Sequence, residues 1–131
     1  SNVKPITVPS QDIVLGLYYM TRERPFAYGE NRAYSSPDEV WLAWQSGETH
    51  LQAKVRVRIE GTLETTTVGR TLLYYLCPKV LPFSQFNKVM KKKEISALID
   101  ECFRVLLRYH LWYLHRSAGH GNSRREEAVA R

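Results

Sequence analysis

Apolar and charged residues alternate most regularly between positions 53 and 60. The apolar members occupy every second position: Ala53, Val55, Val57 and Ile59. A period of two places apolar side chains on one face of a β-strand and charged ones on the other. Glu60 and Gly61 indicate a turn, and the β-branched residues 65–68 are typical of a return strand. The pattern predicts a β-hairpin with strands near residues 52–60 and 63–68.

Ser10 marks the start of a helix before this hairpin. It precedes an apolar run from Ile13 to Met20 and can cap the first amides of the helix. We expect this helix to be short and mostly buried. Gly16 in its middle costs roughly 1 kcal/mol relative to alanine, which predicts that another backbone approaches closely there.

A second helix is predicted after a loop that covers residues 21–35 and has no sustained period. Ser36 is the expected N-cap, Pro37 the first helical residue, and Glu39 the second half of a capping box. The helix should run from Pro37 to about Gln45. Gly47 follows where a left-handed residue is favoured.

The chain after the hairpin is strongly apolar. For the run TLLYYLCP, helix and strand stay open, because periodicity cannot separate them. Spacings of three and four then predict a C-terminal helical pair near residues 83–107. Lys91, Lys92 and Lys93 fall between the two helices. They are interpreted either as a solvated basic corner at a helix end, where the dipole favours cations, or as phosphate contacts.

The pattern changes again after Tyr109. No helical stripe continues past Leu114, and residues 109–131 are predicted to form a divergent basic tail that need not be ordered. His110, His115 and His120 suggest metal ligands, but flexible residues 117–119 separate the last two, so no metal site is predicted. The expected fold class is α+β, with one domain over residues 1–108.

Charge is distributed unevenly along the 131 residues, whose length is that of one domain. Acidic and basic side chains cancel over residues 1–60, so the net charge of +6 lies in residues 61–131. A basic half favours an anionic partner such as nucleic acid, through counterion release, although a solvated basic face is the alternative. As a free-standing nucleic-acid-binding module, the chain would use Lys91, Lys92, Lys93, Arg124 and Arg125 as phosphate contacts.

Several classes of protein are not favoured by the sequence. No apolar stretch approaches the length of a membrane span and the first ten residues are polar, so we expect a soluble, cytoplasmic chain. Cys77 and Cys102 belong to no C-x-x-C unit and are expected to be two buried thiols rather than a disulfide or zinc ligands. No motif of a nucleophile with its base, of paired carboxylates or of a phosphate-binding glycine loop occurs.

Two long strings carry a family resemblance. KPITVPSQDIVLGLYYMTRERP and, after the charged hairpin, TTTVGRTLLYYLCPKVLPFSQFNKVMKKKEISALIDECFR follow each other in order and at suitable spacing. They resemble the pore domain of the largest subunit, β′, of bacterial multisubunit RNA polymerase, in the stretch that follows the active-site barrel. The resemblance covers about residues 3–105.

The resemblance implies a place in a large enzyme. The pore domain lines the secondary channel, through which nucleoside triphosphates reach the active centre and into which the RNA 3′ end moves on backtracking. Gln11, in P-S-Q-D, and Lys4 are expected to lie near the nucleotide and the RNA 3′ end. Implied partners are the β, α and ω subunits, the rest of β′, DNA and RNA.

Other parts of the family pattern are missing from this sequence. The motif N-A-D-F-D-G-D, whose aspartates hold the catalytic magnesium, is absent, so we expect no cofactor in this chain and no catalysis by the chain alone. After Arg104 the sequence departs from the family. An altered reading frame, a split subunit, a divergent lineage and a cut fragment all stay open as explanations.

Overall fold

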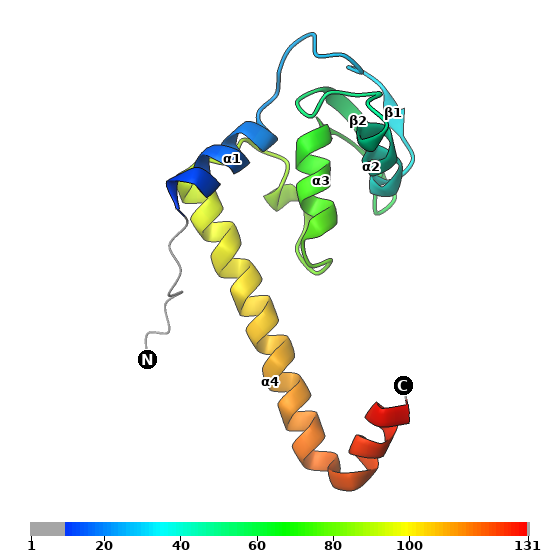
Figure 1. The fold of residues 1–131 in the computed structure, drawn as a ribbon, viewed down its shortest axis with the longest axis vertical. Coiled ribbons are helices and arrows are strands. Elements are labelled where there is room, and N and C mark those ends of the chain that lie inside the picture. Colours follow the sequence, from blue (N-terminus) through cyan, green and yellow to red (C-terminus); the bar gives the residue numbers. More distant parts are fainter. Residues whose placement is uncertain (1–9, 131) are drawn as a thin grey trace.

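The computed structural model describes the backbone of residues 10–130 and the side chains of residues 10–118. Helices and a three-stranded sheet form a rounded head from which the last helix projects (Figure 1). The elements in chain order are α1 (Gln11–Thr21), β1 (Ala33–Tyr34), α2 (Pro37–Gln45), β2 (Lys54–Ile59), β3 (Thr62–Thr67), α3 (Val68–Leu76), a 3-10 turn (Phe83–Gln85) and α4 (Lys92–Ala130). The predicted α+β class is confirmed.

The predicted hairpin is formed by β2 and β3. The strands are antiparallel, with Ile59 opposite Thr62. Glu60 and Gly61 form the two-residue turn, and both have positive φ, of 50° and 87°, which matches the twist of the flanking strands. Every second residue of β2 is buried, and Val57 is 0% exposed. The return strand ends one residue earlier than predicted, because Val68 begins α3.

A short strand lies within the segment that was predicted to be a loop. Ala33 and Tyr34 form β1, which runs parallel to β2 with Tyr34 opposite Val57. A strand of two residues is too short to show a period, so it could not be predicted from the pattern of residues. It completes the three-stranded sheet in the order β1-β2-β3.

Helix α2 has the predicted bounds and N-cap. The Ser36 hydroxyl accepts a hydrogen bond from the Glu39 N–H at 3.3 Å, and Pro37 is the first helical residue. The Glu39 carboxylate accepts from the N–H and hydroxyl of Ser35 instead of from the N–H of Ser36, so the capping box is displaced by one residue. Gly47 has φ 81°, as expected for a left-handed residue.

The uniformly apolar run after the hairpin is helical and forms α3. The Thr67 hydroxyl caps it by accepting from the Arg70 N–H at 3.2 Å. Val68, Leu72 and Tyr74 are buried against the sheet and α2 within the hydrophobic core. Burial along most of its length accounts for the apolar character of α3.

Helix α1 begins after the Ser10 cap, as predicted, but the expectation that it is mostly buried was wrong. Ile13, Leu15 and Tyr19 are 49%, 57% and 53% exposed, and Thr21 is the one buried residue of α1. The helix lies at the edge of the head, where α3 and α4 contact it. Within the described chain, therefore, much of an apolar helix remains uncovered.

The close backbone approach predicted at Gly16 occurs instead at Gly69. Apart from the adjacent residues and backbone of α1 itself, no described atom lies within 4 Å of the place where a Cβ of Gly16 would be. A Cβ at Gly69 would overlap the carbonyl oxygen of Met20, and the Gly69 N–H donates to the Leu51 carbonyl at 2.8 Å. Gly69 thus allows α3 to begin directly against the end of α1.

Only the second helix of the predicted C-terminal pair is present. A single 3-10 turn, Phe83–Gln85, replaces the first helix, and one long helix, α4, follows. Phe86 and Met90, which share an apparent helical face, are both 0% exposed in the core. The non-helical segment between them is tied to β3, because the Asn87 side-chain amide donates to the Thr65 carbonyl at 3.0 Å.

Helix α4 continues without interruption past residue 108 to Ala130. The proposed division between residues 1–108 and 109–131 therefore falls inside a helix, and it stays a prediction. Among residues 10–130, the structure contains no helix with the combination of length and apolar content needed to traverse a membrane.

Cys77 and Cys102 are free thiols, as predicted, but they are half-buried rather than buried. Cys77 caps the end of α3 and Cys102 lies on α4, and each thiol affects the pKa of the other. Burial, followed by the neighbouring Cys102, raises the pKa of Cys77 to about 11. Burial also raises the pKa of Cys102, against the opposing effect of its hydrogen bond with Cys77.

Candidate nucleotide-proximal and nucleic-acid sites

Gln11 is the first residue of α1 and is exposed. Its side chain makes no hydrogen bond to another residue that the structure describes. The preceding Ser10 hydroxyl accepts from the Ile13 N–H at 3.3 Å, which satisfies one of the free amides of the helix start. The cap fixes the direction in which α1 begins and therefore the position of Gln11.

Thr21 anchors the other end of α1. Its hydroxyl donates to the Leu17 carbonyl at 2.8 Å and accepts from the Met90 N–H at 2.8 Å. Both bonds are shielded, since Thr21 is 0% exposed. The hydroxyl thus joins α1 to the segment that leads into α4.

Arg70, at the start of α3, holds the same end of α1 from a second side. Its Nε donates to the Thr21 carbonyl at 2.8 Å, and a terminal nitrogen donates to Asn87 at 3.4 Å. Partial burial lowers the pKa of Arg70, and the charge of Glu23 opposes this. The guanidinium stays protonated at neutral pH and joins the end of α1 to the segment that contains Asn87.

Gln52 supplies a third attachment. The side-chain amide of Gln52 donates to the Tyr19 carbonyl at 2.7 Å, and the backbone carbonyl of Gln52 accepts from the Arg24 N–H at 2.9 Å. Thr21, Arg70 and Gln52, which position α1, were not identified from the sequence. The available signal was weak: Gly69-Arg70 lies in the quoted string TTTVGR, but nothing local shows that Arg70 reaches Thr21.

Lys91, Lys92 and Lys93, called here the lysine cluster, are all exposed at the start of α4. The expected position was a helix end where the dipole favours cations, which is a C-terminus, and this expectation was wrong. The cluster lies at an N-terminus, where the dipole disfavours cations. None of the three lysines forms an ion pair with another described residue.

Glu94 offsets the positive charge at this helix start. Its carboxylate accepts from the Lys91 N–H at 3.1 Å. Hydrogen bonds from the backbone of Glu94 itself and of Lys91, with the charges of Lys88 and Lys91, lower the pKa of Glu94 despite an opposing effect of burial. The carboxylate is therefore ionised at neutral pH, and it caps the helix that carries the cluster.

Helices α1 and α4 contact each other, but no hydrogen bond or ion pair among the described residues joins Gln11 to the lysine cluster. Met90, next to the cluster, bonds to Thr21 at the end of α1. Gln11 is the first residue of α1, and a helix of ten steps places Gln11 and Thr21 roughly 15 Å apart. Lys4 lies outside the described residues, as do the side chains of Arg124 and Arg125.

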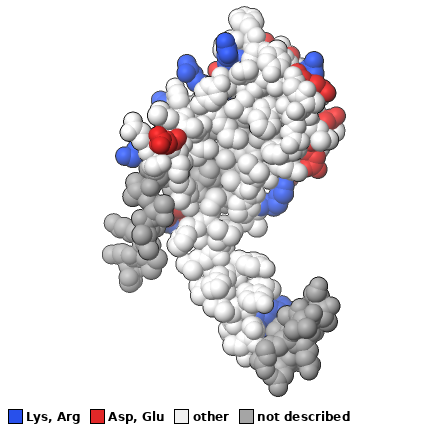
Figure 2. All heavy atoms as spheres, in the orientation of Figure 1, with Lys and Arg blue, Asp and Glu red and all other residues white. Residues whose placement is uncertain are grey.

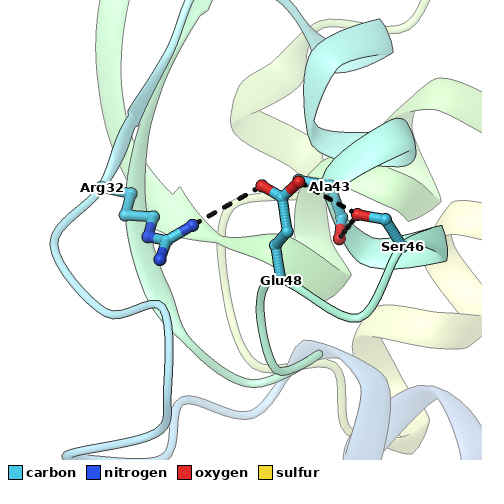
Figure 3. A network of polar contacts seen from close by, with 4 residues as sticks. All are labelled: Arg32, Ala43, Ser46 and Glu48. Carbon is cyan, nitrogen blue, oxygen red and sulfur yellow. Dashed lines mark hydrogen bonds and ion pairs between the residues drawn. The ribbon is translucent and has the colours of Figure 1, made fainter.

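On the face drawn in Figure 2, charge on the head is mixed rather than gathered into one patch. Figure 2 shows Lys and Arg interspersed with Asp and Glu over this face of the head, and few charges along the projecting part of α4. One exposed ion pair joins Arg32, before β1, to Glu48, after α2, at 3.6 Å. Glu48 also accepts from the Ser46 hydroxyl at 3.2 Å (Figure 3). An exposed pair of this kind contributes roughly 0–1 kcal/mol and is interpreted as local bracing of the loop.

The described residues do not fit a magnesium site. Among them, no group of three or more His, Cys, Asp or Glu side chains is placed to hold a metal ion. His110 and His115 both lie on α4, and His120 lies outside the residues whose side chains are described. No step of a metal-dependent reaction is assigned to the described side chains.

Comparison with known families shows what kind of protein this fold belongs to. The family model described as RNA polymerase Rpb1, domain 3, matches residues 1–108. The chain belongs to this RNA polymerase family. The match includes both quoted strings, the hairpin between them and the first half of α4. The resemblance to the β′ subunit that the sequence suggested is confirmed.

Two curated relatives carry the name DNA-directed RNA polymerase subunit beta'. The protein of Syntrophobacter fumaroxidans is 56% identical over 101 residues, which are 77% of this chain and 8% of the relative. The protein of Bdellovibrio bacteriovorus is 52% identical over 105 residues, which are 80% of this chain and 8% of the relative. The chain thus corresponds to a small segment of these RNA polymerase subunits.

Proposed function

We propose that this chain is part of the largest subunit of a bacterial DNA-directed RNA polymerase, where it forms a wall of the secondary channel beside the active centre. The family match over residues 1–108 carries this proposal. In this role, the chain supports RNA synthesis without supplying the aspartates that hold magnesium. Its partners are the β, α and ω subunits, the rest of β′, DNA and RNA, and its location is the cytoplasm.

Gln11 and Lys4 are the residues proposed to lie near the nucleotide and the RNA 3′ end. The Gln11 amide offers two donors and an acceptor, and it lies at a helix N-terminus, whose free N–H groups favour phosphate. Lys4 adds a cation for the same anionic ligands. The bonds of Thr21, Arg70 and Gln52 hold α1 in place and so support this use of Gln11.

A chimeric polymerase tests the proposal. Residues 1–108 replace the matching segment of the Syntrophobacter β′ subunit, and the chimera is reconstituted with the β, α and ω subunits. We expect it to co-purify with β and to extend RNA. Failure to assemble would contradict the proposal.

Gln11→Ala in this chimera tests the proposed contact. We expect the KM for the incoming nucleotide to rise about tenfold, because a hydrogen bond to a charged group is lost. Gln45→Ala is the matched control, since Gln45 is also exposed but ends α2. Equal KM values for the two variants would remove Gln11 from the site.

A free-standing nucleic-acid-binding module is the second candidate, and the exposed, unpaired lysine cluster favours it. Arg124 and Arg125 would add phosphate contacts. Binding of the 131-residue chain to duplex DNA should then weaken steeply with salt, and changing the three lysines to glutamine should reduce the slope by about 2.7 units.

The control for this experiment removes three charges elsewhere. Lys54, Arg56 and Arg58 are exposed on the outer face of β2, and their change to glutamine should leave the slope nearly unaltered. A response of the parent chain that is flat between low and moderate salt would exclude the module.

A further inference from the structure

An apolar pocket of about 370 Å³ opens between three helices of the head. Its volume is much larger than the roughly 30 Å³ that one water molecule occupies in the liquid. Helix α1 contributes Gly16 and Tyr19, α2 contributes Trp41 and Trp44, and α3 contributes Leu72 and Leu76. No charged side chain lines it, so the pocket suits an apolar occupant.

The rim of the pocket is apolar and exposed as well. Tyr19, Trp44 and Leu76 are 53%, 38% and 65% exposed, and Ile13 and Leu15 extend the apolar surface along α1. Helix α1 has no charged residue between Ile13 and Met20. A helix that is apolar on all sides is normally buried, and a contiguous exposed apolar surface marks an interaction site.

Gly16 indicates how closely the occupant approaches. Apart from the adjacent residues and backbone of α1 itself, the position of its missing Cβ has no described atom within 4 Å, although glycine in the middle of a helix is unfavourable. Within the head, therefore, nothing requires glycine here. A glycine that faces an uncovered apolar pocket leaves room for a neighbouring backbone.

The pocket wall restricts the occupant's secondary structure. Side chains of three helices form most of the wall, and the backbone groups inside a helix already bond to one another. An extended segment buried there would leave its own N–H and C=O groups without partners, which is costly. A helix satisfies these groups internally, so it is the favoured occupant.

We propose that this pocket is the docking site of an α-helix from another part of the same β′ subunit, with apolar side chains in the pocket and its backbone over Gly16. The inference rests on the proposed function. The chain spans only 8% of the curated relatives it matches. In such a subunit, many helices would be covalently tethered near the pocket, and tethering raises the effective concentration of a weakly binding segment.

Photo-crosslinking in the chimeric polymerase tests this docking. Tyr19 is replaced by p-benzoylphenylalanine, and crosslinked peptides are identified by mass spectrometry. We expect crosslinks to a helical segment of β′ outside these 131 residues. Tyr28 is the matched control, because it is a tyrosine of similar exposure, 58%, that does not line the pocket, and it should not give that crosslink.

Filling the space at Gly16 tests the predicted close approach. Gly16→Leu should reduce the Tyr19 crosslink about tenfold, because overpacking a close contact is strongly unfavourable. Gly16→Ala should reduce it much less. Equal crosslinking in the parent and in Gly16→Leu would overturn the approach of a backbone over this residue.

The outcomes separate this inference from the proposed function. A chimera that assembles and transcribes, but whose Tyr19 crosslinks to another subunit, to a second β′ or to nothing, overturns the docking alone. A chimera that does not assemble removes the proposed function and the docking with it.

Discussion

The hydroxyl of Thr21 accepts a hydrogen bond from the N–H of Met90, 69 positions later in the chain, at 2.8 Å. The same hydroxyl donates to Leu17 within α1. One buried group thus ends the first helix and fixes the chain just before the last. This arrangement orients α1, whose other end carries Gln11.

Thr21→Val should destabilise the 131-residue chain by about 1–3 kcal/mol, because valine has nearly the same shape but leaves the buried Met90 N–H without an acceptor. Urea unfolding followed by circular dichroism measures the change. Thr62→Val, on the exposed start of β3, is the control and should change stability by about 0.5 kcal/mol or less. Similar losses in both variants would contradict the assigned role of Thr21.

Replacement by alanine should change the stability of the chain in opposite directions at two glycines. Gly69→Ala should be strongly destabilising, by about 2 kcal/mol or more, because the new methyl group meets the Met20 carbonyl oxygen. Gly16→Ala should stabilise the isolated chain by about 0.5–1 kcal/mol, because the site is open and alanine favours the helix. Thermal unfolding of the two variants checks both signs, and a shared sign would refute the contrast.

The two faces of β2 should also differ sharply. Val57→Asp places an unpaired charge at a position that is 0% exposed, and we expect a loss of about 3 kcal/mol or more. Arg56→Asp, one residue away on the exposed face, should be nearly neutral. Denaturant midpoints measure both, and equal effects would mean that the strand faces are assigned wrongly.

The Cys77 thiol should react slowly at neutral pH. With a pKa of about 11, only about one thiol in a thousand is ionised at pH 8, and the thiolate is the reactive form. Alkylation by iodoacetamide, followed by peptide mapping, should accelerate about tenfold per pH unit until near pH 11. The urea-unfolded chain is the control, and its rate should level off near pH 9. A plateau near pH 9 in the folded chain would contradict the pKa shift.

The raised pKa of Cys77 also fixes the sign of its effect on stability. The folded state holds the thiol proton more tightly than the unfolded state, whose pKa is near 9.0. The free energy of unfolding that the protonated Cys77 thiol contributes is therefore complete below pH 9 and is lost as the pH rises toward 11. Unfolding free energies measured from pH 8 to 11 should fall less steeply in Cys77→Ala.

Local patterns predicted the hairpin and the helix starts well. The alternation around Val57, the Glu60-Gly61 turn and the caps at Ser10 and Ser36 each depend on residues close together in sequence, and each appears in the structure. These features follow from backbone geometry that neighbouring residues control. The solvated position expected of the lysine cluster is observed, whereas the proximity of Gln11 to a nucleotide stays a prediction.

Predictions that depended on distant residues were less successful. The spacing of Phe86 and Met90 resembles a helix, but core contacts and the Asn87 bond hold that segment in another form. The apolar character of α1 suggested burial, yet its apolar surface is left open within the head. The roles of Thr21 and Arg70 depend on partners 69 and 49 positions away.

The sequence by itself determined the α+β class, the sheet's main hairpin and, through two long strings, the RNA polymerase family. Only the tertiary structure decided that Gly69 rather than Gly16 accommodates a backbone, and that Thr21 and Arg70 clasp the end of α1. The physical reason is range: periodicity and capping act over a few residues, whereas packing and buried hydrogen bonds join groups whose proximity arises only when the whole chain folds.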